Sequence, residues 1–125
     1  PADIDRVGMT AALRRAFAAA IAEVEAQGVA VYVVLLDGNP LHLDPREVNV
    51  VKGDGKCASI AAASLVAKEA RDHVMEAYAE QYPGYGFESN KGYGSEGHMA
   101  AIRERGLCPI HRRSFCSFAA QESLF

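Results

Sequence analysis

One apolar run, Val29–Leu36, constrains the fold of this chain more than any other feature. It contains no charged residue, and the turn residues Asp37-Gly38-Asn39-Pro40 end it abruptly. A continuous run of this kind predicts a β-strand that is buried on both faces, as in parallel sheets. Such a strand needs neighbours and cover, but only one further strand is predicted, Val48–Val51. We therefore expect an α/β fold with two parallel-type strands and flanking helices, from which further strands are missing.

Helical patterns surround the two strands. Apolar residues recur on one stripe over Met9–Val24, where Thr10 would cap the helix and Gly28 would end it. An alanine-rich pattern predicts a longer helix over about Cys57–Glu80, and a short helix is predicted around Ser95–Arg105. The order helix, strand, strand, helix, loop, helix is typical of the α/β class.

The length and charge of the chain limit its function. With 125 residues, half of them hydrophobic, it can form one modest core. The net charge of −3 argues against a generally basic coat for nucleic acid. Four arginines nevertheless gather near the C-terminus, where they would form either a local phosphate-binding face or an ordinary solvated surface. They are Arg103, Arg105, Arg112 and Arg113.

The cysteines and the hydropathy indicate a cytoplasmic location. Cys57, Cys108 and Cys116 show no CxxC spacing, so we expect no disulfide framework, which fits a reducing compartment. No apolar run reaches the length of a transmembrane helix, and no charged-then-apolar leader opens the sequence. We therefore expect a cytoplasmic protein.

Two aspartates are candidates for metal-dependent chemistry. Asp37 stands at the carboxyl end of the first strand, where catalytic groups of open α/β sheets collect, although an aspartate also simply opens a turn there. Asp72 shares a helix face with Ser64 and Lys68, and an ion pair with Lys68 is its simpler explanation. Two such aspartates can bind a divalent cation, but two-metal phosphodiester hydrolysis normally uses more carboxylates.

A structural zinc site would need two close pairs of ligands, and the C-terminal third of the chain provides one. The residues considered are His98, Cys108, His111 and Cys116. We expect packed thiols and hydrogen-bonded histidines instead, with His111 holding local structure. Nearby aromatic residues would either stack on sugars and bases or, more often, pack a long loop against the body. They are Tyr78, Tyr82, Tyr85, Phe87 and Tyr93.

Several short motifs occur in a fixed order along the chain. They are Leu36-Asp37-Gly38-Asn39, Val51-Lys52-Gly53-Asp54, the run from Ser59 to Lys68 with Arg71-Asp72, the run from Tyr82 to Phe87, Lys91-Gly92-Tyr93-Gly94 with His98, and His111-Arg112-Arg113-Ser114-Phe115. Together they resemble the central signature of ribonuclease HII, the type 2 ribonucleases H, over about Asp3–Phe115. No single motif would be specific, whereas the whole set in this order is.

The resemblance implies a ribonuclease H-like fold and an Mg²⁺- or Mn²⁺-dependent endonuclease. Such an enzyme cleaves the RNA strand of RNA–DNA hybrids and single ribonucleotides in duplex DNA. Asp37 and Asp72 match the third and fourth carboxylates of a four-carboxylate, two-metal design, and Tyr93 matches a tyrosine that packs on the sugar at the RNA–DNA junction. Further partners of phosphate or carboxylate groups would be Lys52, Ser64, Lys68 and Lys91.

One part of the family pattern has no counterpart in these 125 residues. The family opens with an Asp-Glu-Ala-Gly-Arg-Gly-type segment, which supplies two carboxylates and the loop that senses the 2′-OH. Because nothing here matches it and the first residue is Pro1, we expect residues 1–118 to be the C-terminal part of a catalytic domain, inactive alone.

Residues 119–125 are expected to form a tail. Gln121, Leu124 and Phe125 resemble the Gln-x-x-Leu-Phe peptide that docks on the bacterial sliding clamp, although so short a motif also arises by chance. Two alternatives to a split enzyme therefore stay open. One is a fragment that binds nucleic acid or the clamp without cleaving, and the other is a truncated chain without a function of its own.

Overall fold

The computed structural model of the chain describes residues 1–117, so the predicted clamp residues Gln121, Leu124 and Phe125 lie outside the described residues. The chain divides into two compact units, and each is described by itself. We call Arg6–Leu65 the sheet unit. We call Pro1–Asp5 together with the chain from Val66 onward the aromatic unit, after its core. The prediction of a catalytic-domain part over residues 1–118 stays a prediction.

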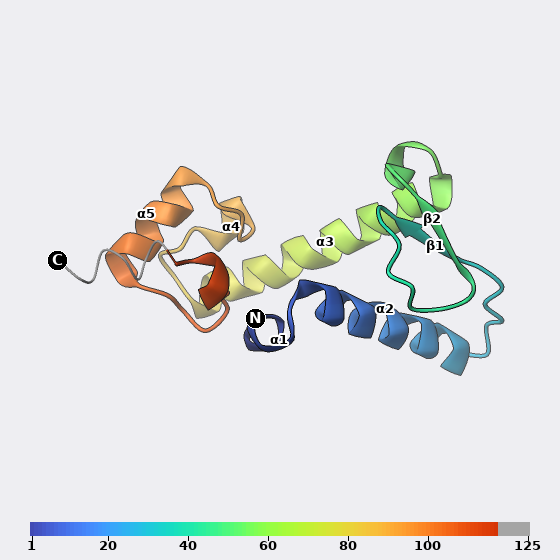
Figure 1. The fold of residues 1–125 in the computed structure, drawn as a ribbon. Helices are drawn as coiled ribbons and strands as arrows, with labels where there is room; N and C mark the ends of the chain where they lie inside the picture. Colours follow the sequence, from blue (N-terminus) through green and yellow to red (C-terminus); the bar gives the residue numbers. More distant parts are fainter. Residues whose placement is uncertain (118–125) are drawn as a thin grey trace. The chain divides into compact units, whose positions relative to one another are not determined.

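The sheet unit contains the two strands, and Figure 1 shows them next to the start of the long helix. Its elements are α2 (Met9–Ala26), β1 (Val34–Asp37), β2 (Glu47–Val50), the 3-10 turn η1 (Gly53–Gly55) and the beginning of α3 (Ala58–Gln81). The strands pair in parallel, with Val34 opposite Glu47 and Asp37 opposite Val50. The predicted α/β class, with a parallel pair and flanking helices, is confirmed.

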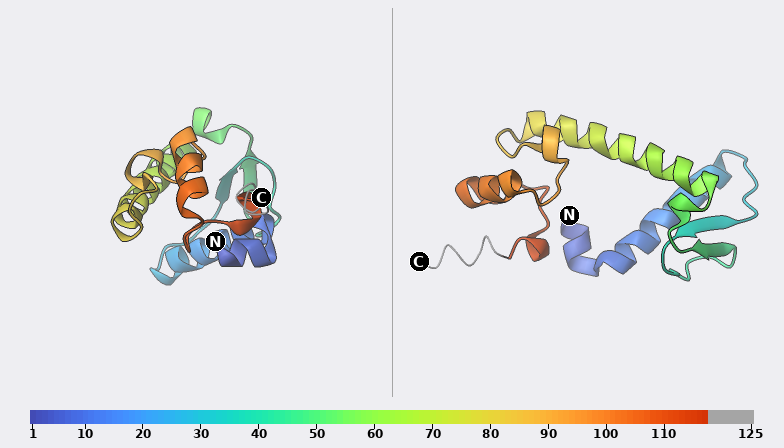
Figure 2. Two further views of the ribbon diagram at one scale, coloured as in Figure 1. Left: turned by 90° about the vertical axis from the view of Figure 1, so that its left-hand side faces the viewer. Right: turned by 90° about the horizontal axis from the view of Figure 1, so that it is seen from above.

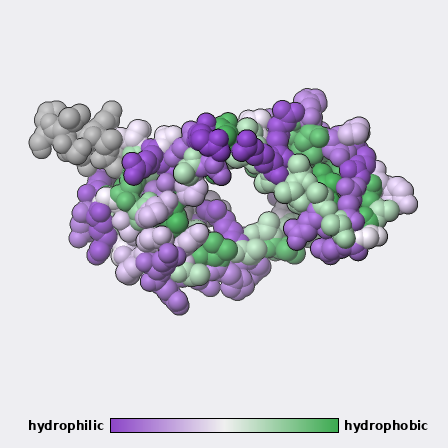
Figure 3. Space-filling view, turned by 90° about the horizontal axis from the view of Figure 1, so that it is seen from below, coloured by the Kyte–Doolittle hydropathy of each residue, from purple (hydrophilic) through white to green (hydrophobic). Residues whose placement is uncertain are grey.

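The predicted double burial of the first strand is wrong. Only the end of the apolar run forms β1, and Leu36, at 4% exposure, is its one buried residue. Tyr32 is 88% exposed and Val33 is 49% exposed. The reason is that burial on both faces needs covering elements and a strand on each side, whereas β1 pairs within the described chain only with β2. Hydrophobic side chains therefore stay at the surface, visible as green areas at the right of Figure 3.

Helix α2 forms where the apolar stripe predicts it, but its start differs from the prediction. Gly8, at φ 84 and ψ 160, is the residue before the helix, so Thr10 lies inside the first turn and does not cap it. The helix ends as predicted, with Gln27 as the C-cap and Gly28 in the left-handed region at φ 83. The stripe is not buried, because Met9, Leu13, Phe17 and Val24 are 37% to 42% exposed.

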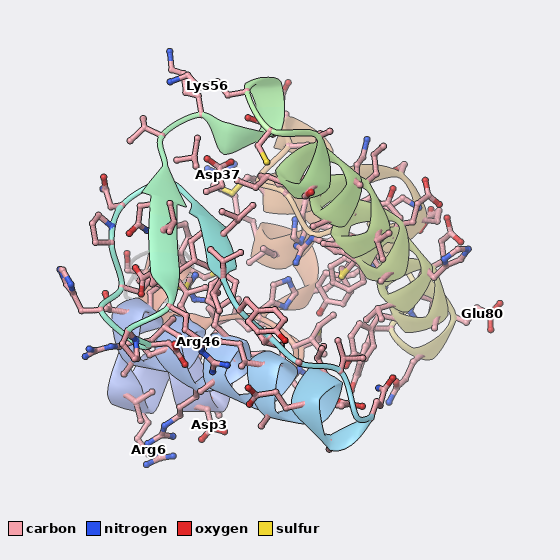
Figure 4. The ribbon with its side chains drawn as sticks, turned by 90° about the vertical axis from the view of Figure 1, so that its right-hand side faces the viewer. Asp3, Arg6, Asp37, Arg46, Lys56 and Glu80 are labelled. Atoms are coloured by element: carbon pink, nitrogen blue, oxygen red, sulfur yellow. The ribbon has the colours of Figure 1, made fainter. Side chains whose placement is uncertain are left out.

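Arg46, labelled in Figure 4, ties the loop before β2 to the rest of the sheet unit. Its guanidinium donates to both carboxylate oxygens of Asp44 at 2.8 Å, to Glu25 of α2 at 2.5 Å and to the carbonyl of Val31 at 2.9 Å. The hydrogen bonds that Asp44 accepts from the Arg46 side chain and from the Arg46 backbone N–H lower its pKa to about 2. One side chain therefore links the end of α2, the chain before β1 and the start of β2.

The aromatic unit has a small packed core at the C-terminal end of α3. Figure 2 shows α4 (Phe87–Asn90) and α5 (Glu96–Arg105) gathered there. The buried hydrophobic side chains of this core are Met75, Tyr85, Phe87 and Ile102. Phe87 is 1% exposed and stacks on Tyr85 with ring centroids 5.4 Å apart. The short helix α4 replaces part of the loop that the sequence predicts.

The ends of α5 agree with the sequence. Ser95 is its N-cap and accepts a hydrogen bond from the backbone N–H of His98, and Gly106, at φ 79, ends it. Asp5 accepts hydrogen bonds from the backbone N–H of Arg113 and from the Ser114 hydroxyl, which joins residues 1–5 to the 3-10 turn η2 (Arg113–Phe115). In the described part of the chain, no helix has the length and apolar character needed to cross a membrane.

Candidate functional site

Asp37 closes β1 at its carboxyl end, as Figure 4 shows, and its side chain is exposed. Its Oδ1 accepts a hydrogen bond of 2.7 Å from the backbone N–H of Gly53. Among the described residues, the other oxygen accepts no hydrogen bond. Asp37 therefore combines one oxygen fixed by the backbone with one that can bind a cation or a hydrogen-bond donor.

Gly53 reaches Asp37 because it has no side chain. A Cβ at this position would lie 2.6 Å from Cδ1 of Ile60 and 3.3 Å from Cβ of Val50. The preceding residue, Lys52, adopts the left-handed conformation at φ 55 and ψ 47, which turns the chain into η1. The side chain of Lys52 is exposed. The Lys52-Gly53 pair is thus a tight turn that presents one N–H to the catalytic candidate.

Asp72 lies in the part of α3 that belongs to the aromatic unit, and it is half-buried. No ion pair joins it to Lys68 among the described residues, so the simpler explanation of Asp72 is not observed. Lys68 is exposed, as is Ser64 on the earlier part of α3. Each unit therefore carries one of the two aspartates.

Tyr93 is the exception among the clustered aromatics. Tyr85 and Phe87 form the core, and Tyr78 and Tyr82 pack against it, as the structural interpretation of the cluster predicts. Tyr93 is 67% exposed instead, and the guanidinium of Arg71 lies 5.5 Å from the centre of its ring. Tyr93 thus presents an aromatic surface to solvent.

The loop of Tyr93 runs close against α3. Arg71 donates a hydrogen bond to the carbonyl of Lys91 at 3.1 Å. A Cβ on Gly92, which has φ 81, would lie 3.0 Å from Cε of Met75. The Lys91 ammonium pairs with Glu76 at 2.6 Å, and this hydrogen bond holds the pKa of Glu76 below its usual range. Lys91 is therefore already paired, which the prediction of a phosphate contact did not anticipate.

The structure brings Tyr93 and Lys91 to the segment of α3 that carries Arg71 and Asp72, within the aromatic unit. It brings Asp37 to Gly53 within the sheet unit. Sequence reasoning did not select Arg71, Glu76 or Gly53 as site residues. Gly53 and Arg71 stand in motifs that carry the resemblance, but no local spacing predicts what Arg71 and Glu76 contact.

A metal centre within the described chain would need several ligands in one place. In residues 1–117, no three His, Cys, Asp or Glu side chains gather in a group that could hold a metal ion. The histidines and cysteines considered for zinc make hydrogen bonds or remain free thiols, with the Nε2 atoms of His98 and His111 3.0 Å apart. Asp37 and Asp72 are hard oxygen ligands of the type that Mg²⁺ and Mn²⁺ prefer, so their chemistry fits these ions.

Comparison with known proteins gives one consistent family. The family model of ribonuclease HII matches residues 2–118. A ribonuclease HII of Maricaulis maris is 45% identical over the whole of this chain and 57% of its own length. One from Levilactobacillus brevis is 44% identical over 92% of this chain and 44% of its own length, and one from Bacillus licheniformis is 47% identical over 84% of this chain and 41% of its own.

The chain thus spans about half the length of the curated relatives that it matches. The match of the family model nevertheless covers nearly all of its residues, and it includes every motif that carries the resemblance to this family, whereas the Gln-x-x-Leu-Phe peptide lies outside it. The chain belongs to the ribonuclease HII family.

Proposed function

We propose that this chain is part of a ribonuclease HII that cleaves RNA strands in RNA–DNA hybrids and single ribonucleotides in duplex DNA. Asp37 and Asp72 act as two of its four catalytic carboxylates. The observation that carries the proposal is the state of Asp37, which stands exposed at the strand end with one oxygen fixed by Gly53 and the other free of hydrogen bonds in the described chain. The other two carboxylates lie on a segment outside these 125 residues.

The chain's own residues prepare the site for divalent cations. When bound, Mg²⁺ or Mn²⁺ supplies an activated water and stabilises the charge on the scissile phosphate and the leaving oxygen. Asp37 and Asp72 provide carboxylate ligands, and the N–H of Gly53 restricts the rotation of Asp37. A ligand held in one orientation loses less conformational entropy when it binds.

In this proposal, Tyr93 contacts the nucleic acid. Its exposed ring offers a stacking surface for a sugar or a base, and the Arg71 guanidinium beside it adds positive charge. Lys52, Ser64 and Lys68 are exposed and able to contact phosphates. Lys91 contacts phosphate only if it exchanges its Glu76 partner.

The tail adds a proposed partner. Gln121, Leu124 and Phe125 would dock on a bacterial sliding clamp, which would deliver a cytoplasmic repair nuclease to newly made DNA. The test is the affinity of the chain for the clamp before and after deletion of residues 121–125. Unchanged affinity would rule out the proposed docking.

The catalytic proposal is tested with a DNA duplex that contains one ribonucleotide, in Mg²⁺ or Mn²⁺. We expect no nicking by the chain alone. We expect nicking after addition of a polypeptide that carries a relative's Asp-Glu-Ala-Gly-Arg-Gly-type segment. The matched control is the Asp37→Asn, Asp72→Asn double variant, which should stay inactive both alone and with the added polypeptide.

Two outcomes would contradict this account in different ways. Nicking by the chain alone that the double variant abolishes would show that no outside carboxylates are needed. Binding of the duplex without nicking in either mixture would favour the alternative of a non-catalytic nucleic-acid-binding chain.

A further inference from the structure

Two buried histidines lie behind the loop that carries Tyr93. His98 is 5% exposed and His111 is 9% exposed, and their Nε2 atoms are 3.0 Å apart. Nδ1 of His98 lies 2.7 Å from the carbonyl oxygen of Tyr93, and Nδ1 of His111 lies 2.9 Å from the backbone nitrogen of Cys108. A line of hydrogen bonds therefore runs from Cys108 through both rings to Tyr93. We call it the histidine relay.

The end groups of the histidine relay determine where its protons lie. The N–H of Cys108 can only donate, so Nδ1 of His111 accepts and carries no proton. The carbonyl of Tyr93 can only accept, so Nδ1 of His98 carries a proton. One proton fits between the two Nε2 atoms, and it belongs to His111. Both rings are therefore neutral, in opposite tautomers.

The surroundings of His111 favour its neutral form. Phe87 packs edge-on against His98 at 5.3 Å, and Tyr85 lies 5.1 Å from His111. Burial, followed by the neighbouring His98, lowers the pKa of His111. The Tyr85 ring next to His111 has a pKa raised by burial, and the backbone N–H of Cys108 donates to the same histidine.

The histidine relay ends on the backbone of Tyr93, the residue that we propose contacts the substrate. The carbonyl of Tyr93 also accepts a hydrogen bond from the N–H of Ser95 at 2.8 Å, and the N–H of Tyr93 donates to the carbonyl of Asn90 at 2.9 Å. The backbone of Tyr93 is thus held on both sides while its ring remains exposed. An exposed ring on a fixed backbone needs little ordering when it stacks on a ligand.

We propose that His98 and His111 are positioning residues for Tyr93, and that the histidine relay sets the affinity of the chain for a duplex that contains a ribonucleotide. This inference rests on the proposed substrate role of Tyr93. If the two histidines had a purely structural role, replacing them would change the affinity for the duplex by the same factor whether or not the Tyr93 ring is present.

The first test needs no substrate. Nitrogen-15 spectra of the imidazoles at neutral pH, assigned with the variants below, should show His98 protonated at Nδ1 and His111 protonated at Nε2. Hydrogen exchange of the Tyr93 and Ser95 amides should be faster in His98→Leu than in the unmodified chain. Identical tautomers, a charged ring or unchanged exchange would overturn the histidine relay itself, whatever the substrate role of Tyr93.

The second test compares two replacements of His98 in binding to a duplex with one ribonucleotide. Leucine removes the donor to Tyr93, whereas the side-chain amide of asparagine places an N–H close to the position of Nδ1. We expect His98→Leu to weaken binding roughly tenfold, the factor given by about 1.4 kcal/mol, and we expect His98→Asn to retain most of the affinity. If His98→Leu does not fold, His98→Asn is compared with Tyr93→Ala instead. The proposal would be overturned if folded His98→Asn lost as much affinity for the duplex as Tyr93→Ala does.

A double variant separates positioning from general damage. If His98 acts through Tyr93, His98→Leu should weaken binding no further once Tyr93→Ala is present. Additive losses would overturn the positioning role. Unchanged affinity in Tyr93→Ala alone would reject the proposed substrate role of Tyr93, and the spectra would still decide whether the histidine relay exists.

Discussion

The two units of this chain bury their hydrophobic residues very differently. In the aromatic unit, Phe87, Ile102 and Met75 are at most 7% exposed, and partly buried hydrophobic side chains pack against them. In the sheet unit, the buried hydrophobic side chains are Leu36 and Ile60, while much of the apolar run and of the α2 stripe is exposed. The aromatic unit therefore has a core of its own, whereas the sheet unit leaves much of its apolar surface exposed.

This difference also distinguishes the settings of Tyr93 and Asp37. Tyr93 stands on the well-packed unit, where loop, helix and histidine relay fix it. Asp37 stands on the poorly covered unit, where the N–H of Gly53 fixes one oxygen. We infer that this chain alone already positions Tyr93 for the substrate, whereas the catalytic position of Asp37 depends on completion of the sheet.

The largest expected effect is seen when a phenylalanine is replaced by alanine in the aromatic unit, compared with the same replacement in the sheet unit. Phe87→Ala should lower the free energy of unfolding by about 3–5 kcal/mol, because it empties a fully enclosed site. Phe17→Ala on α2 is the matched control, and it should change this free energy by less than about 1 kcal/mol, because Phe17 is 37% exposed. Urea denaturation followed by circular dichroism measures both. Equal losses would contradict the contrast between the units.

A smaller effect is expected at the turn that holds Asp37. Gly53→Ala should lower the free energy of unfolding by about 1–3 kcal/mol, because its Cβ would overlap Ile60, whose side chain is buried. It should also weaken binding of Mn²⁺ in the complemented protein. Gly55→Ala is the matched control, since nothing lies within 4 Å of a Cβ there. Similar effects of the two substitutions would argue against a special role for Gly53.

The smallest expected effect is a difference in pH dependence between the units. The pKa of His111 is lowered, so its contribution to stability is complete above the ordinary histidine value of about 6.5 and is lost as the pH falls through the lowered pKa. The pKa of Asp44 is lowered to about 2, so its contribution is complete above 3.8 and is lost as the pH falls from there through about 2.

Hydrogen exchange between pH 7.5 and pH 5, corrected for intrinsic rates, measures this difference. Amides near His111 should lose protection in that range, and amides near Asp44 should keep theirs. Parallel loss in both segments would contradict the assignment of His111 as a buried neutral ring.

The sequence predicts local structure well where a period and an end signal agree. The long helix was expected over Cys57–Glu80 and forms over Ala58–Gln81, and α5 ends at Arg105, directly before Gly106. The run Val29–Leu36 shows the limit of such reasoning. An apolar run specifies what a strand would bury, but pairing partners decide which of its residues form a strand.

For the candidate site too, the sequence predicted some features and not others. Local pattern made Asp37, Asp72 and Tyr93 candidates beside simpler structural explanations, the resemblance gave them their specific roles, and these roles stay predictions. The contacts of Gly53, Arg71 and the two histidines could not be predicted, because they join residues from separate elements through hydrogen bonds that leave no periodic signal. A three-dimensional structure was needed to connect them.

The central claim is that the sheet unit is completed by a segment outside these 125 residues, while the aromatic unit is already formed. Hydrogen exchange of the chain, alone and with the polypeptide that carries the Asp-Glu-Ala-Gly-Arg-Gly-type segment, tests it most directly. We predict that amides around Phe87 and Ile102 exchange slowly in both samples, and that amides of β1 become protected only after the addition. Protection of β1 in the chain alone, or unprotected β1 in a mixture that nicks the duplex, would contradict the account.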